Sequence, residues 1–354
     1  MRLPKITKPY HMKDFRFTLV ITVLVLSVLG ILVIGSANES VQVKQIVGLV
    51  VGMIAMIVIS LIDYVWVLNL YWIIYGFNII ILLCTKFFGT TVNGAQRWID
   101  LGFTNFQPSE LTKLLMILFF AKFLMNHEED LNSMRTILSA VGLIAPTLLL
   151  IVLQPDLSTT ISIALVFCVM MYLAGLSYKF IGTMLAILIP VAVIFVSIVE
   201  QPNQPILKDY QQNNSIMAIG SGQLTGKGLN NNTTTSVKNG NFISEPQTDF
   251  IFAIVGEELG FVGCCIVIGL LLLIIIQCIL IGIRSQDLAG RIICCGIAAQ
   301  IGFQSFMNIS VATGVLPNTG IPLPFVSYGL TSLVSMCMGI GFVLNIGLQP
   351  KKYQ

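Results

Sequence analysis

Residues 17–34 read FTLVITVLVLSVLGILVI, an uncharged apolar run that is long enough to cross a bilayer as one helix. A basic segment precedes it, as in a signal peptide, but no small-residue cleavage motif follows, so we expect a retained first transmembrane helix. The same character extends over all 354 residues, of which 56% are hydrophobic and only 10% charged. This composition excludes a soluble domain and indicates an integral membrane protein. The net charge of +3 is too small to indicate a nucleic-acid partner.

Further apolar runs of about the length that crosses a bilayer follow along the chain. With the first, they lie near residues 15–36, 43–62, 65–85, 109–126, 136–153, 157–175, 179–199, 251–282, 291–313 and 325–347. They predict an all-α polytopic bundle of about ten transmembrane helices, which forms a single domain over residues 1–354. Two polar segments interrupt the runs, near 86–108 and 200–250. Lys and Arg residues are more numerous on the opposite side, so we expect both segments outside and both termini in the cytoplasm.

Polar motifs mark the outer ends of four predicted helices. They are QPSE at 107–110, QPD at 154–156, TD at 248–249 and PFVSYG at 324–329. Each alone is an ordinary helix start with proline or an acidic residue in the first turn. Four of them on one side of the bundle predict a shared site, where free helix N–H groups suit a phosphate. Gln154, Asp156 and Ser327 are therefore candidate substrate-binding residues.

Three charged residues near these helix starts are further candidates. Glu110 and Lys113 are three residues apart, so they can pair on one helix face. The pair is either structural, or it shapes a cavity in which Lys113 helps to bind a pyrophosphate. Arg97 lies in the outer segment 86–108, near Gly94 and next to Trp98, and it either meets solvent and lipid phosphate or binds a substrate phosphate through two hydrogen bonds.

Asp249 is the candidate catalytic base. Both histidines, His11 and His127, are predicted on the cytoplasmic side, so a reaction at the outer surface requires a carboxylate base. Asp249 joins the polar segment 200–250 to an apolar helix, which can desolvate the carboxylate and raise its pKa.

Other features have plainer interpretations. Glu257 and Glu258 either close a polar network or mark a break in the helix predicted at 251–282. The glycine-rich stretch GSGQLTGKG at 220–228 resembles a phosphate loop, but no strand precedes it, which favours a flexible loop or a substrate surface. The eight cysteines lie in apolar runs without metal-ligand spacing, so we expect them to pack as small hydrophobic side chains.

Taken together, these motifs resemble the SEDS family (shape, elongation, division and sporulation). The matching stretches, in family order, are GAQRW at 94–98, QPSELTK at 107–113, QPDL at 154–157, TDFIF at 248–252, EELG at 257–260 and PFVSYG at 324–329. Two positions depart from the family pattern, because Gln247 stands where histidine is frequent and Leu330 where a second glycine is frequent. The stretch GIPLP at 320–324 is more similar to the elongation branch (RodA-like) than to the division branch.

The resemblance implies a peptidoglycan glycosyltransferase that polymerises lipid II at the outer face of the bacterial cytoplasmic membrane. It assigns the essential aspartate to Asp249 and a required ion pair to Glu110 and Lys113. In this mechanism Asp249 deprotonates the acceptor sugar, the donor is inverted, and undecaprenyl pyrophosphate leaves. Arg97, Lys113 and helix N-termini offset the charge of the leaving group, with a divalent cation (Mg or Mn) as a further candidate.

The resemblance also implies a partner, a class B penicillin-binding protein that supplies the transpeptidase. Two alternatives remain, a flippase for lipid-linked precursors and an inactive scaffold. The concentration of charge on one side of the membrane disfavours a flippase, which needs a polar path through the bilayer. Intact Asp249, Glu110 and Lys113 disfavour a scaffold.

Overall fold

The computed structural model describes residues 15–92, 95–100, 102, 105–178, 180, 182, 186, 205–229, 246–318 and 320–349. Their helices are α1 (Phe17–Ala37), α2 (Glu39–Leu61), α3 (Tyr64–Asn69), α4 (Tyr71–Phe88), α5 (Pro108–Asn126), α6 (Met134–Val152), α7 (Leu157–Leu173), α9 (Pro205–Ser221), α10 (Ile251–Ile283), α11 (Leu288–Ala312) and α12 (Leu330–Leu348). Among these described helices, seven are long and apolar enough to cross a membrane, namely α1, α2, α4, α6, α10, α11 and α12. The prediction of an all-α, multi-pass membrane bundle is confirmed; the run predicted at 179–199 lies almost entirely outside the described residues.

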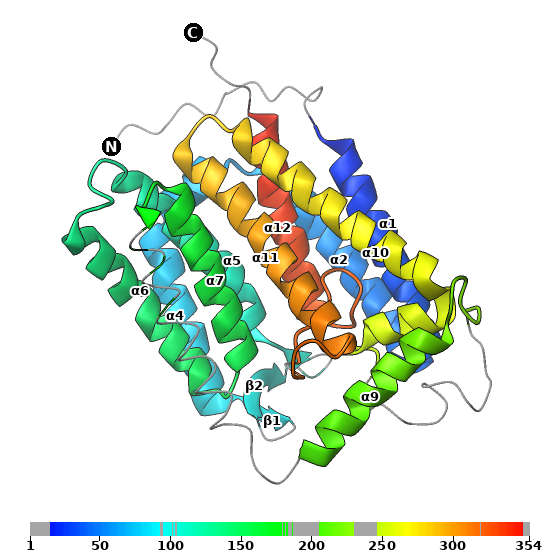
Figure 1. The fold of residues 1–354 in the computed structure, drawn as a ribbon. Coiled ribbons are helices and arrows are strands. Elements are labelled where there is room, and N and C mark those ends of the chain that lie inside the picture. The colour runs from blue at the N-terminus through cyan, green and yellow to red at the C-terminus, as the bar shows by residue number, and fades with distance from the viewer. Residues whose placement is uncertain are drawn as a thin grey trace.

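The helices run side by side, with α2 against α12 and α10 against α11 (Figure 1). Small residues allow the close approach of α2 and α12, as is common between transmembrane helices. A Cβ atom added to Gly52 would lie 3.0 Å from Sγ of Cys337, and one added to Gly341 would lie 2.8 Å from the carbonyl oxygen of Met56. The first residues of α1 and the last of α12 lie at one end of the bundle (Figure 1). The strands and α9 lie at the other end, which we call the site end.

Both polar segments contain structure that the sequence did not predict. The segment 86–108 holds a three-stranded antiparallel sheet of β1 (Thr90–Val92), β2 (Ala95–Asp100) and β3 (Asn105–Phe106), in the order β1-β2-β3. Ile99 of β2 is paired with Phe106 of β3, which leads directly into α5. The segment 200–250 holds α9, a polar helix of 17 residues.

Two predicted helix boundaries are corrected. The run predicted at 65–85 is divided at Leu70 into the short α3 and the longer α4. The helix predicted from 325 begins at Leu330 instead, because a turn precedes it. In that turn the Ser327 hydroxyl accepts a hydrogen bond from the Leu323 N–H at 2.7 Å, and the Ser327 N–H donates back to the Leu323 carbonyl at 3.0 Å.

Helix α10 is interrupted near its start. Gly260 has φ 66° and ψ −166°, a conformation that glycine adopts without strain and that ends a helix. The interruption separates a short helical arm, residues 251–259, from the long membrane-spanning part of α10. Glu257 and Glu258 lie on the arm just before the break, so the interpretation that they mark a break in this helix is confirmed.

Candidate functional site

The helix starts predicted to share a site do come together at the site end. Between α5 and α12, the Gln107 N–H donates to Thr331 Oγ1 at 3.2 Å. Between α5 and α7, Ser109 Oγ donates to Asp156 Oδ2 at 3.3 Å. The first bond satisfies a backbone N–H at the start of α5 that has no partner within the helix, and the second joins the starts of α5 and α7.

The residues before α10 are connected to these helix starts through the turn before α12. Ser327 Oγ donates to the Thr248 carbonyl at 2.7 Å, and the Tyr328 N–H donates to the Gln247 carbonyl at 2.9 Å. The Ser327 hydroxyl thus has two partners within the protein, the Leu323 N–H and the Thr248 carbonyl, and its bond to Thr248 fixes the backbone next to Asp249. Burial raises the pKa of Tyr328, so its phenol stays protonated at neutral pH.

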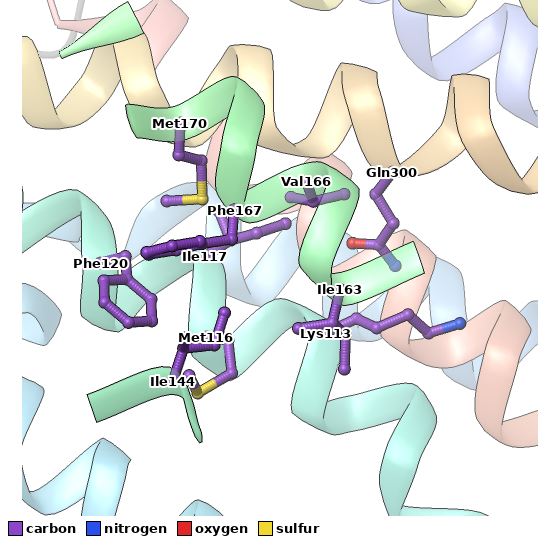
Figure 2. Close-up of a pocket in the computed structure, with 10 residues that line it drawn as sticks. All are labelled: Lys113, Met116, Ile117, Phe120, Ile144, Ile163, Val166, Phe167, Met170 and Gln300. Carbon is purple, nitrogen blue, oxygen red and sulfur yellow. The ribbon is translucent and has the colours of Figure 1, made fainter. Parts of the chain in front are cut away.

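Glu110 and Lys113 form the expected ion pair, with 2.7 Å between Oε1 and Nζ. Only 2% of the Glu110 side chain and 4% of the Lys113 side chain are exposed. Removal of either partner would leave a buried charge, so the two depend on one another. The aliphatic part of Lys113 also lines an apolar pocket between α5, α6, α7 and α11, and its ammonium group points away from Phe120 and Phe167 (Figure 2).

Arg97 is held by the segment before α7. Its Nε donates to the Gln154 carbonyl at 3.3 Å, its Nη2 donates to the Pro155 carbonyl, and its Nη1 lies 3.8 Å from Asp156 Oδ1. Asp156 is itself the N-cap of α7, where its carboxylate accepts from the Thr159 N–H at 3.2 Å. The Gln154 side chain donates to the Leu82 carbonyl at 2.9 Å. The guanidinium is therefore fixed in place, yet 28% of the Arg97 side chain stays exposed.

A small polar cavity lies among these residues. Its lining consists of Gln107, Glu110, Lys113, Asp156, Thr159, Ser162, Gln304, Gly320, Ile321 and Pro322. Gly320 connects the cavity to Asp249, since a Cβ atom built on Gly320 would lie 3.6 Å from Asp249 Oδ2. Asp249, which is half-buried, thus lies beside the cavity that Glu110 and Lys113 line.

Sequence reasoning missed the contribution of α11. Asn308 Nδ2 donates to the carbonyls of Asp249 at 2.9 Å and Ile321 at 2.8 Å, and Gln304, one turn earlier, lines the cavity. A signal was present, because Gln300, Gln304 and Asn308 are spaced four residues apart and so share one face of an otherwise apolar helix. Polar residues on one face of a membrane helix indicate an interior function.

The glycine-rich stretch is neither a phosphate loop nor a free loop. Residues 222–228, which we call the strap, bond through their backbone to the break in α10. The N–H groups of Lys227 and Gly228 donate to the carbonyls of Glu257 and Glu258, each at 3.0 Å. Lys227 Nζ also lies 2.8 Å from Glu257 Oε1. The strap therefore holds the arm that begins two residues after Asp249.

Glycine is required for this contact. Gly226 has φ 78°, and a Cβ atom there would lie 2.2 Å from the Glu258 carbonyl oxygen. A Cβ atom on Gly260 would lie 2.3 Å from the Gly226 nitrogen. The preceding helix α9 is in turn fixed to α11, where Gln212 Nε2 donates to the Val311 carbonyl at 2.9 Å and Ser215 Oγ donates to the Ala312 carbonyl at 2.7 Å.

The chain has relatives of known family. Residues 12–352 match the profile of the cell cycle protein family of FtsW, RodA and SpoVE. The chain is 35% identical to the peptidoglycan glycosyltransferase MrdB of Escherichia coli K12 over 354 residues, which cover 94% of each chain. It is 34% identical to stage V sporulation protein E of Bacillus subtilis over 318 residues, or 86% of each chain.

The chain is also similar to solved structures. The crystal structure of the rod shape determining protein RodA of Thermus thermophilus matches with a TM-score of 0.75 and 27% identity, over 94% of this chain and 96% of that one. A chain from the structure of a peptidoglycan synthase complex matches with a TM-score of 0.80 and 27% identity, over 94% of this chain and 97% of that one. The chain therefore belongs to the SEDS family of FtsW, RodA and SpoVE proteins.

Proposed function

We propose that this chain is a peptidoglycan glycosyltransferase that polymerises lipid II into glycan strands at the outer face of the bacterial cytoplasmic membrane. The similarity to MrdB over 94% of both chains supports the reaction class. The observation that carries the mechanism is the position of Asp249, a half-buried carboxylate beside a polar cavity at one end of an apolar bundle.

In the proposed reaction, Asp249 accepts the proton of the attacking sugar hydroxyl. The hydroxyl oxygen then bonds to the anomeric carbon of the lipid-linked donor, from the face opposite the pyrophosphate. The pyrophosphate leaves with the electron pair of the broken bond, and the configuration of the anomeric carbon is inverted. A positioned base typically contributes about 10²–10⁴-fold to such a step. The pyrophosphate leaving group supplies the driving force, so no nucleotide takes part.

Arg97 is the main candidate for binding the leaving pyrophosphate, because its guanidinium is fixed and partly exposed. Gln154 and Asp156 act by holding Arg97, and Ser327 acts through the backbone before Asp249. Lys113 is paired with Glu110 inside the cavity, so it contributes only a weaker positive charge, from a greater distance, to a leaving group that binds outside the cavity at Arg97. Among the described residues no three His, Cys, Asp or Glu side chains are grouped as a metal site, so no step is assigned to a divalent cation.

A groove on the bundle surface suits the lipid part of the substrate. It lies between α2, α5 and α12, has a volume of about 450 Å³, and is almost entirely apolar. Its lining is Val43, Lys44, Val47, Gly48, Val51, Phe106, Leu111, Leu330, Thr331, Val334, Ser335 and Met338. Thr331 and Ser335 also bond to α5 at the site, so the groove reaches the catalytic region. An isoprenoid chain could occupy this groove while its pyrophosphate reaches the site.

The proposed partner is a class B penicillin-binding protein that crosslinks the strands. The match to a chain of a peptidoglycan synthase complex, whose structure concerns the coordination of polymerisation and crosslinking, supports this pairing.

The test is polymerisation of labelled lipid II by the purified protein, alone and with its transpeptidase partner. Long strands resolved on a gel are expected. If no strands form under either condition, while labelled lipid II crosses the membrane of vesicles that contain the protein, the flippase alternative replaces this proposal.

A further inference from the structure

Gln304 is a buried amide whose polar atoms have no hydrogen-bond partner among the described residues. Its side chain is 0% exposed, and neither Nε2 nor Oε1 has a hydrogen-bond partner among the residues that the structure describes. An unpaired buried amide costs about 1–3 kcal/mol in proteins, and such groups are rare. Gln304 lines the polar cavity beside Asp249, where a bound substrate could supply both missing partners.

Two further unpaired atoms belong to residues that line this cavity. Glu110 Oε2, a hydrogen-bond acceptor, and Ser162 Oγ, a donor and acceptor, also lack partners among the described residues. Three polar groups from α5, α7 and α11 are thus available in one small space. Their common location indicates a site for a ligand rather than an isolated packing defect.

The charges around the cavity indicate a neutral ligand. Glu110 of the lining is paired with Lys113, and Asp156 of the lining lies near Arg97 outside it, while Asp249 beside the cavity adds a further carboxylate, so the region has no net positive charge. Desolvating an anion here would have little net compensation. A hydroxyl group both donates and accepts, which matches the amide of Gln304 and the carboxylate oxygen of Glu110.

The size of the cavity limits which chemical group of a ligand can enter it. Its free volume is about 10 Å³, close to the minimum that holds one water-sized group. A sugar hydroxyl has this size, whereas an acetamido or phosphate group is larger. The connection through Gly320 places such a hydroxyl near the Asp249 carboxylate.

We propose, on the basis of the proposed function, that Gln304 is a sugar-binding residue that recognises a hydroxyl of the substrate other than the attacking one. Its Nε2 donates to the hydroxyl oxygen, and the hydroxyl proton is donated to Glu110 Oε2 or Gln304 Oε1. The site thereby selects a sugar with a hydroxyl at that position.

The first test is Gln304→Met, which keeps the length of the side chain and removes the amide. No hydrogen bond within the described protein is lost, so the unfolding temperature in detergent should equal or exceed that of wild type. The kcat/KM for lipid II should fall about 10- to 100-fold, as expected for a lost substrate hydrogen bond. Gln300→Met is the matched control, because Gln300 lies one turn earlier on α11 and lines the apolar pocket rather than the polar cavity (Figure 2). Its side-chain amide donates one weak hydrogen bond, to Met336 Sδ at 3.7 Å. The Gln300→Met variant should keep a kcat/KM close to wild type.

The second test compares lipid-linked disaccharides that each lack one hydroxyl. Wild type should lose about tenfold or more in kcat/KM for one of these deoxy substrates. Gln304→Met should use that same deoxy substrate as well as it uses the parent, since the interaction is already absent. Gln304→Leu repeats the test with a second apolar side chain.

The results can distinguish a wrong role for Gln304 from a wrong proposed function. A wild-type kcat/KM in Gln304→Met, or unchanged penalties for all deoxy substrates, would overturn the assignment of Gln304 alone. A lowered unfolding temperature with unchanged penalties would show a structural amide instead and would overturn it too. Absence of strands from wild type with the parent substrate would overturn the proposed function itself.

Discussion

The side-chain amide of Asn308 donates hydrogen bonds to the main-chain carbonyls of Asp249 and Ile321, at 2.9 and 2.8 Å. One residue of α11 thereby ties together the segment that carries the proposed base and the segment that lines the cavity. Backbone carbonyls at such a junction need donors, and Asn308 supplies both. The position of Asp249 relative to the cavity depends on this side chain.

Asn308→Leu should therefore impair catalysis through the position of Asp249. We expect kcat to fall about 10- to 100-fold with a smaller change in KM, because misplacement of a catalytic group mainly affects the transition state. The measurement is steady-state polymerisation together with thermal unfolding. Ser305→Ala is the control, since among the described residues the Ser305 hydroxyl bonds only to the Ile301 carbonyl of its own helix. An equal loss of kcat in both variants would contradict the positioning role of Asn308.

The strap should respond differently to the same substitution at two of its glycines. Gly226→Ala places a Cβ atom 2.2 Å from the Glu258 carbonyl, so we expect the strap to separate from the arm, with losses of both stability and activity. Gly228 has a similar positive φ of 89°, but a Cβ atom added there would have no atom of the described residues within 4 Å. Gly228→Ala should lose only about 1–2 kcal/mol of stability from backbone strain. The unfolding temperature measures the loss of stability, and strand synthesis measures the loss of activity. If Gly226→Ala loses no more of either than Gly228→Ala, the contact between the strap and the arm is unimportant.

The length and type of the membrane helices could be predicted because apolar runs of about 20 residues have few other stable outcomes. The common location of the four helix starts also followed from the sequence, since alternate helices of a bundle begin at the same end. Helix α9 could not be predicted, because its residues Asn213, Asn214 and Ser215 are typical of loops. This helix is fixed by hydrogen bonds from Gln212 and Ser215 to the end of α11, and such contacts between distant segments cannot be read from the local sequence.

The candidate site was predicted only in part. Asp249, Glu110, Lys113 and Arg97 were found because charge is rare in this chain. Gln304 and Asn308 were missed because uncharged amides are common and their contacts join distant segments. The strap was misinterpreted because its glycines read as flexibility, whereas their role is close backbone approach to the break in α10.

A single and a double variant can distinguish a structural role of the Glu110–Lys113 pair from a functional one. Lys113→Met leaves the buried Glu110 carboxylate without its cation, so we expect a loss of about 3–5 kcal/mol in the free energy of unfolding. The double variant Glu110→Gln with Lys113→Met should regain most of that stability. If Lys113 also binds the leaving group, the stable double variant should still polymerise at least tenfold more slowly than wild type. Full activity of the double variant would show that the pair is structural only.

The groove can be tested by filling it. Val334→Trp places a large side chain on α12 within the groove lining, so an isoprenoid chain bound there would be displaced. We expect KM for lipid II to rise about tenfold with little change in kcat, which is the pattern of lost ground-state binding. The control is Val262→Trp, at an exposed position on α10 outside the groove. Equal KM values for wild type and Val334→Trp would rule out this groove as the lipid site.

The most direct measurement is the rate of strand synthesis by Asp249→Asn, which keeps the size of the side chain and removes the base. The substitution leaves the Asn308 contact intact, because that bond is to the main-chain carbonyl. We predict an unfolding temperature equal to that of wild type and polymerisation of labelled lipid II slower by about 10²–10⁴-fold. Strand synthesis at the wild-type rate by a folded Asp249→Asn protein would contradict the assignment of Asp249 as the catalytic base.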